Sequence, residues 1–81
     1  MRVRVKFFAY TREITGRREM EIDVKESARL GDILDILVKK FPALERYRDE
    51  IKMAINHEYA PLETALRERD EVAILPPVSG G

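Results

Sequence analysis

The sequence predicts an α+β fold in which one main helix packs on one face of a curved, mixed sheet of four to five strands. Two early segments, residues 2–9 and 19–24, alternate between apolar and charged side chains, the period of a half-buried strand. Residues 29–41 instead repeat their apolar positions at helical spacing. Residues 72–75 form a short apolar run that indicates a buried last strand.

The first strand, residues 2–9, presents two chemically different faces. Its inward positions are apolar, namely Val3, Val5, Phe7 and Ala9. Its outward positions are basic except for Phe8. We expect the basic side chains to pair with acidic ones on the neighbouring strand rather than to bind phosphate. Phe8 is expected either to pack under a loop or to mark a contact patch.

A helical turn and a second strand follow. Residues 10–14 can form one turn that ends at Gly16 in the left-handed conformation. In the second strand Met20, Ile22 and Val24 point inward and the acidic residues outward, which predicts an antiparallel hairpin with the first strand.

The main helix is predicted over residues 29–41, and Pro42 ends it. Its start is less sharply defined, because Ser27 is the nearest residue of a capping type and Gly31 weakens the first turn. Residues 42–50 indicate a polar loop or a short helix.

The second half of the chain completes the sheet. A third strand is expected over residues 51–55, with a turn at residues 56–58. Tyr59 is expected to open a short edge strand, and Leu62 and Leu66 should return to the core. In the last strand, one face holds Val72 and Ile74, and the other holds Ala73 and Leu75.

Composition excludes several classes of function. Fifteen basic residues balance fifteen acidic ones, so net charge does not favour a nucleic acid or an anionic membrane as partner. The chain has no cysteine and one histidine, His57, which argues against a bound metal, a thiol nucleophile and a disulfide. No apolar run approaches the ~20 residues that span a bilayer, so we expect a soluble, cytoplasmic protein. We also find no catalytic residues of the chain's own, and whether it counts as an enzyme stays open.

The segment that suggests chemistry is the tail at residues 76–81, which follows a domain predicted at residues 1–75. Its residues are Pro76, Pro77, Val78, Ser79, Gly80 and Gly81. The prolines stop the strand because they give no ladder donor, and extended residues reach about 20 Å over such a length. The carboxylate of Gly81 can attack an activated phosphate, become an acyl-adenylate and accept a sulfur or amine nucleophile. Since there is no cysteine, sulfur handled by this chain would ride on its C-terminus. The alternative is a frayed end without function.

The order of elements fits the β-grasp, or ubiquitin-like, architecture, and the whole chain resembles the MoaD type of ubiquitin-like sulfur carriers, the small subunits of molybdopterin synthase in the MoaD/ThiS family. The resemblance rests on residues 5–9, Arg12, Glu13, Gly16, Leu34, Leu37, Pro42, residues 54–56 and above all residues 70–81. Three positions depart from the family pattern: Arg69, where glycine is usual, Arg29, where a capping threonine is common, and Tyr59, where an aliphatic residue is frequent.

The resemblance implies a cycle of partners around Gly81. An E1-like adenylyltransferase would activate Gly81 with ATP, and a sulfur donor enzyme would form the thiocarboxylate. The tail would then enter the large subunit of molybdopterin synthase and give sulfur to a cyclic pyranopterin precursor of the molybdenum or tungsten cofactor. No cofactor would be bound by the chain itself. The alternatives are a protein modifier joined through Gly81 to lysines, a sulfur carrier for thiamine or tRNA thiolation, and a plain interaction module.

The residues also predict a docking patch. Phe8 and Leu75 should point away from the helix-covered face, and they become neighbours if the first and last strands pair. Tyr59 would extend the patch, which a partner could bury. The alternative is a set of scattered surface apolar residues.

Overall fold

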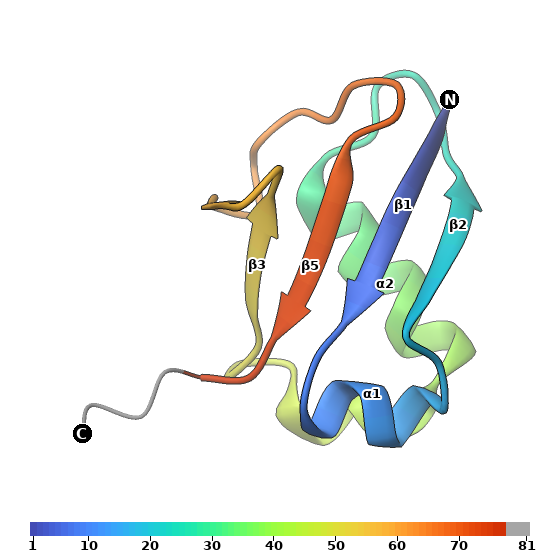
Figure 1. Cartoon of the computed structure of the whole chain (residues 1–81). Coiled ribbons are helices and arrows are strands. Elements are labelled where there is room, and N and C mark those ends of the chain that lie inside the picture. The colour runs from blue at the N-terminus through green and yellow to red at the C-terminus, as the bar shows by residue number, and fades with distance from the viewer. Residues whose placement is uncertain (78–81) are drawn as a thin grey trace.

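A computed structural model describes residues 1–77, in which one face of a five-stranded mixed sheet is covered by the main helix (Figure 1). The elements are β1 (Arg2–Phe7), α1 (Tyr10–Thr15), β2 (Glu19–Asp23), α2 (Leu30–Lys40), the 3₁₀ helix η1 (Pro42–Tyr47), β3 (Lys52–Ile55), β4 (Glu58–Tyr59) and β5 (Glu71–Leu75). The strand order is β2-β1-β5-β3-β4. The pair β1–β5 is parallel and the other three pairs are antiparallel. The predicted β-grasp fold is confirmed.

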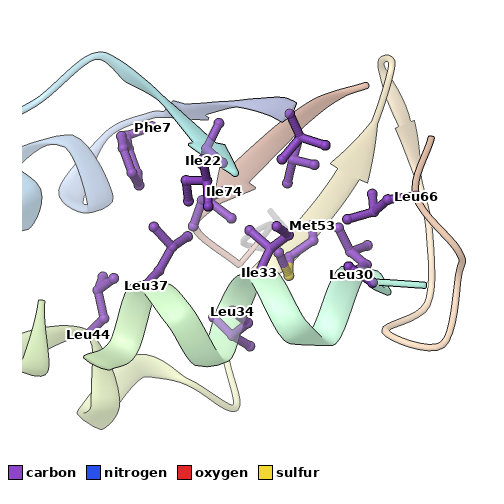
Figure 2. Packing of buried hydrophobic residues seen from close by; sticks show 14 residues of the cluster. Phe7, Ile22, Leu30, Ile33, Leu34, Leu37, Leu44, Met53, Leu66 and Ile74 are labelled. Carbon is purple, nitrogen blue, oxygen red and sulfur yellow. The ribbon is translucent and has the colours of Figure 1, made fainter. Parts of the chain in front are cut away.

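The core lies between α2 and the sheet face that α2 covers (Figure 2). Leu30, Ile33 and Leu37 of α2 are fully buried at helical spacing, so the apolar stripe predicted from the sequence is the packed one. Phe7 of β1 meets Phe41 edge to face, with ring centroids 6.3 Å apart. Each fully buried large side chain contributes about 1.5–3 kcal/mol by leaving water.

β1 ends at Phe7, earlier than predicted. Ala9, expected inward, is exposed and has a φ of 53°, because the chain turns here to enter α1. The short helix itself is confirmed, and it ends at Gly16 with a left-handed φ of 70°.

Leu62 also departs from prediction. Leu66 is buried as expected, whereas Leu62 is 47% exposed. The physical reason is that the loop meets α2 through its backbone, since the Gly31 N–H donates to Leu62 O at 2.9 Å. Main-chain contact of this kind leaves the leucine side chain in solvent.

The start of α2 uses neither a threonine nor Ser27 as its cap. Arg29 is the N-cap residue, and its N–H donates to Asp32 Oδ2 at 2.8 Å. The Leu30 N–H donates to Thr64 O at 2.9 Å. The loop before β5 therefore satisfies donors that a helix start leaves without intrahelical partners.

Two turns have a left-handed backbone. Asn56 and His57 have φ values of 48° and 77° and connect β3 to β4, as the predicted turn requires. Arg69, at the position where glycine is usual in resembling proteins, has a φ of 68°, and its N–H donates to Arg2 O at 2.8 Å. The turn before β5 thus keeps the geometry that glycine favours, at a steric cost. Within residues 1–77, no helix is both long and apolar enough to cross a membrane.

Candidate functional site

The strand that leads to the tail is held in the middle of the sheet. β5 pairs with β1 on one side and β3 on the other (Figure 1). Val72 and Ile74 of this strand are fully buried. Pro76 and Pro77 follow it directly, half-buried and exposed respectively. The remaining predicted tail residues lie outside the described part of the chain: Val78, Ser79, Gly80 and Gly81. The segment before them is therefore a fixed anchor.

The face of the sheet away from α2 carries an apolar cluster, which we call the outer patch, and the register places Lys52 opposite Leu75 on the same face. The patch consists of Phe8, Ala54, Tyr59, Ala73 and Leu75. Ala54 lies opposite both Ala73 and Tyr59 in the strand register, and opposed residues share a face. Leu75 lies on the same face as Ala73, two residues along β5.

The three predicted docking residues differ in exposure and in their position on this face. Tyr59 is 63% exposed on the edge strand β4, and Leu75 is half-buried at the end of β5. Phe8 is 37% exposed and follows the last residue of β1, where the register Phe7–Ile74 places it next to Leu75. The strand order thus places Phe8 at the end of β1, beside the end of β5 that carries Leu75, with Tyr59 on the far side of β3.

Sequence reasoning missed Ala54, which forms the floor between Ala73 and Tyr59. Ala54 is 5% exposed although it faces away from α2. The signal was present, because Met53 and Ile55 are alternate apolar residues of the predicted third strand, and the residue between them must point to the opposite face. A floor of small side chains lets a partner approach the sheet closely.

The other half of the outer face is a ladder of ion pairs over β1 and β2. Arg2 Nε lies 2.9 Å from Asp23 Oδ1, and Arg4 Nε lies 3.4 Å from Glu19 Oε2. The predicted pairing of the basic stripe is confirmed. These side chains are exposed, so solvent screens each pair and its contribution to stability is small. Their charges nonetheless form a border along one side of the outer patch.

Glu71 links the two halves of the face. Its Oε1 lies 3.3 Å from Lys6 Nζ, and its Oε2 lies 3.1 Å from His57 Nε2. Burial works to raise the pKa of Glu71, but the hydrogen bonds and charges of Lys6 and His57 outweigh it and hold the pKa below its ordinary value. His57 itself is exposed in the β3–β4 turn. Among residues 1–77, no group of His, Cys, Asp or Glu side chains has an arrangement that could hold a metal ion.

Comparison with known families places the chain. The model of the ThiS family matches residues 5–81, which include the whole predicted tail. The chain belongs to the ThiS family. The resemblance inferred from the sequence is therefore confirmed at the level of the family.

Three known proteins similar to this ThiS-family chain are informative. An Arabidopsis thaliana protein named molybdopterin synthase sulfur carrier subunit is 39% identical over 79 residues, covering 98% of this chain and 82% of the relative. The crystal structure of SAMP1 from Haloferax volcanii has a TM-score of 0.87 and 39% identity, and all of both chains is covered. A protein–protein complex of subunits 1 and 2 of molybdopterin-converting factor from Helicobacter pylori matches with a TM-score of 0.70 and 27% identity, again over all of both chains.

Proposed function

We propose that this ThiS-family chain is the sulfur carrier subunit of a molybdopterin synthase and that its working group is the carboxylate of Gly81. The observation that carries the proposal is the family match through residue 81, in a chain without cysteine. The anchored strand β5 supports it further, because a rigid base is what a tail needs to reach another protein's site. Relatives named as sulfur carrier subunits support the same assignment.

The proposed chemistry has three steps, all at Gly81. In an E1-like partner, a carboxylate oxygen attacks the α-phosphate of ATP and releases pyrophosphate. Sulfide-level sulfur from a donor enzyme then displaces AMP from the acyl-adenylate and leaves a thiocarboxylate. The thiocarboxylate sulfur bonds to a carbon of the cyclic pyranopterin precursor, and water then cleaves the bond between that sulfur and the Gly81 carbonyl carbon, which regenerates the carboxylate. ATP is a substrate of the activating partner and not a cofactor of this chain.

The large subunit of the synthase is the proposed partner for the outer patch. The patch lies beside the end of β5, so a protein that buries Phe8 and Leu75 also receives the tail. The similarity to the Helicobacter pylori complex of subunits 1 and 2 supports a partner of this kind. In the proposal the catalytic side chains belong to the large subunit, and this chain brings the nucleophilic sulfur.

A second candidate is a protein modifier, which the similarity to SAMP1 favours. In that case a lysine amine of a target protein, rather than sulfur, would displace AMP from Gly81. The product would be an isopeptide bond instead of a thiocarboxylate.

The deciding experiment is intact-mass measurement after incubation with the activating enzyme, ATP and a sulfur donor. We expect a product in which sulfur replaces one oxygen of the Gly81 carboxylate. A chain of the same length with a C-terminal amide is the matched control and should not react, and deletion of Gly80 and Gly81 should abolish the product at an unchanged melting temperature. Branched peptides that end in this tail would instead favour the modifier, and full activity of the amide would refute both candidates.

A further inference from the structure

The hydroxyl of Thr11 joins the end of β1 to the end of β5. Thr11 is fully buried at the start of α1, and its Oγ1 accepts the Phe8 N–H at 2.9 Å. The hydroxyl proton faces two carbonyl oxygens, Phe8 O at 2.7 Å and Ile74 O at 3.0 Å. Ile74 lies 63 residues further along the chain, in the strand that leads to the tail.

The strand pattern shows what this hydroxyl replaces. The Arg4 N–H donates to Asp70 O at 3.0 Å, on the β5 side, whereas the Phe7 N–H donates to Arg18 O at 2.9 Å, on the β2 side. Because residues of a strand alternate in the direction of their N–H groups, the Phe8 N–H points toward β5. Ile74 O is the acceptor that the next rung of the parallel ladder would use. Thr11 Oγ1 lies between this donor and this acceptor and bridges them.

The bridge is needed because the chain leaves the sheet here. The turn begins at Ala9, whose φ of 53° and ψ of −129° favour glycine. The Thr11 N–H donates to Phe8 O at 3.1 Å and closes the turn. Beyond β5, Pro76 and Pro77 have no N–H to donate. Figure 1 shows α1 at the end of the sheet where β1 ends and the C-terminal segment begins.

We infer that Thr11 is a positioning residue for sulfur transfer. Its hydroxyl holds Phe8 against the end of β5, and it thereby fixes the position of Phe8 in the outer patch and the direction of the chain at the end of β5. This inference rests on the proposed function. Its physical content is that Phe8 and Ile74 are held by one side chain, so removal of the hydroxyl releases both the patch and the base of the tail.

Thr15 provides a matched control on the same helix. It is also buried, and its hydroxyl donates to Thr11 O at 2.9 Å within α1 rather than to β5. Thr15→Val and Thr11→Val each remove one buried hydroxyl and add one methyl group. They differ in whether the lost hydrogen bonds join β1 to β5. A purely structural role predicts similar effects of the two changes.

The test compares wild type with Thr11→Val, Thr11→Ser and Thr15→Val at a temperature at which all four are folded. We expect Thr11→Val to weaken binding to the synthase large subunit about tenfold and to speed hydrogen exchange of the Phe8 amide at least about tenfold. Thr11→Ser and Thr15→Val should stay within about twofold of wild type in binding. If Thr11→Val does not fold, the same comparison is made in an Ala9→Gly background, where glycine relieves the turn.

Equal binding by the two valine variants would overturn the inference, as would an unchanged exchange rate of the Phe8 amide in Thr11→Val. Failure of the proposed function is separately visible, because wild type would then form no thiocarboxylate. The hydrogen-exchange measurement needs no partner protein, so it tests the Thr11 bridge whether or not the proposed function is correct.

Discussion

Replacement of Leu75 by glutamate should separate binding from folding. Leu75 is half-buried in the free protein, so a partner removes the rest of its surface from water. Loss of that contact costs about 1 kcal/mol, roughly half of the 1.5–3 kcal/mol for a fully buried leucine. A glutamate side chain buried against an apolar partner adds about 1–3 kcal/mol, even though Lys52 lies opposite position 75 in the strand register. The sum of about 3 kcal/mol corresponds to a Kd raised about 100-fold.

The assay is titration calorimetry with the synthase large subunit, paired with urea unfolding of the free chain. Leu62→Glu is the matched control, because Leu62 is an exposed leucine outside the outer patch, in the loop that contacts α2 through its backbone. It should bind like wild type. Equal weakening by both variants would refute the outer patch as the docking surface. Unfolding of Leu75→Glu would show that Leu75 does not face outward, since a register slip of one residue reverses the faces of a strand.

The other predictions concern stability and are checked by chemical or thermal unfolding. Ala9→Gly and Arg69→Gly should each stabilise the fold by about 1 kcal/mol, because both residues have positive φ; a loss of stability in either would contradict the strain. Ile74→Ala should destabilise by about 2–5 kcal/mol, since Ile74 is fully buried; a cost under about 1 kcal/mol would place it outside the core. Glu71 has a lowered pKa, so its contribution is present above the unfolded value of about 4.3 and is lost as pH falls through the folded value. Glu71→Gln should therefore weaken the fall in the free energy of unfolding as pH is lowered. If the variant and wild type lose stability equally at acid pH, the ion pairs of Glu71 with Lys6 and His57 are not maintained in solution.

Much of the fold follows from local patterns. The alternation around Val3, Val5 and Phe7 and the helical spacing of Ile33 and Leu37 each indicate one element, because side-chain direction repeats every two residues in a strand and every 3.6 in a helix. The buried face of each element was therefore predictable. Where β1 ends was not, since the turn at its end is held by contacts of Thr11 with a strand 63 residues away.

The candidate site divides in the same way. Phe8, Tyr59 and Leu75 were recognised because a large apolar side chain at an outward position is visible in the alternation. The contribution of Ala54 depends on which strand lies next to β3, and the exposure of Leu62 depends on how the loop backbone meets α2. Both are long-range relations, which periodicity along the chain does not contain.

The sequence by itself determined which residue types are present: equal numbers of basic and acidic residues, no cysteine, and two glycines shortly after two prolines. Only the tertiary structure decided where the strand before these residues lies and what surrounds it. The physical reason is that reactive groups are a property of residue type, whereas the outer patch exists because strands distant in sequence, β1, β5, β3 and β4, pair side by side in one sheet.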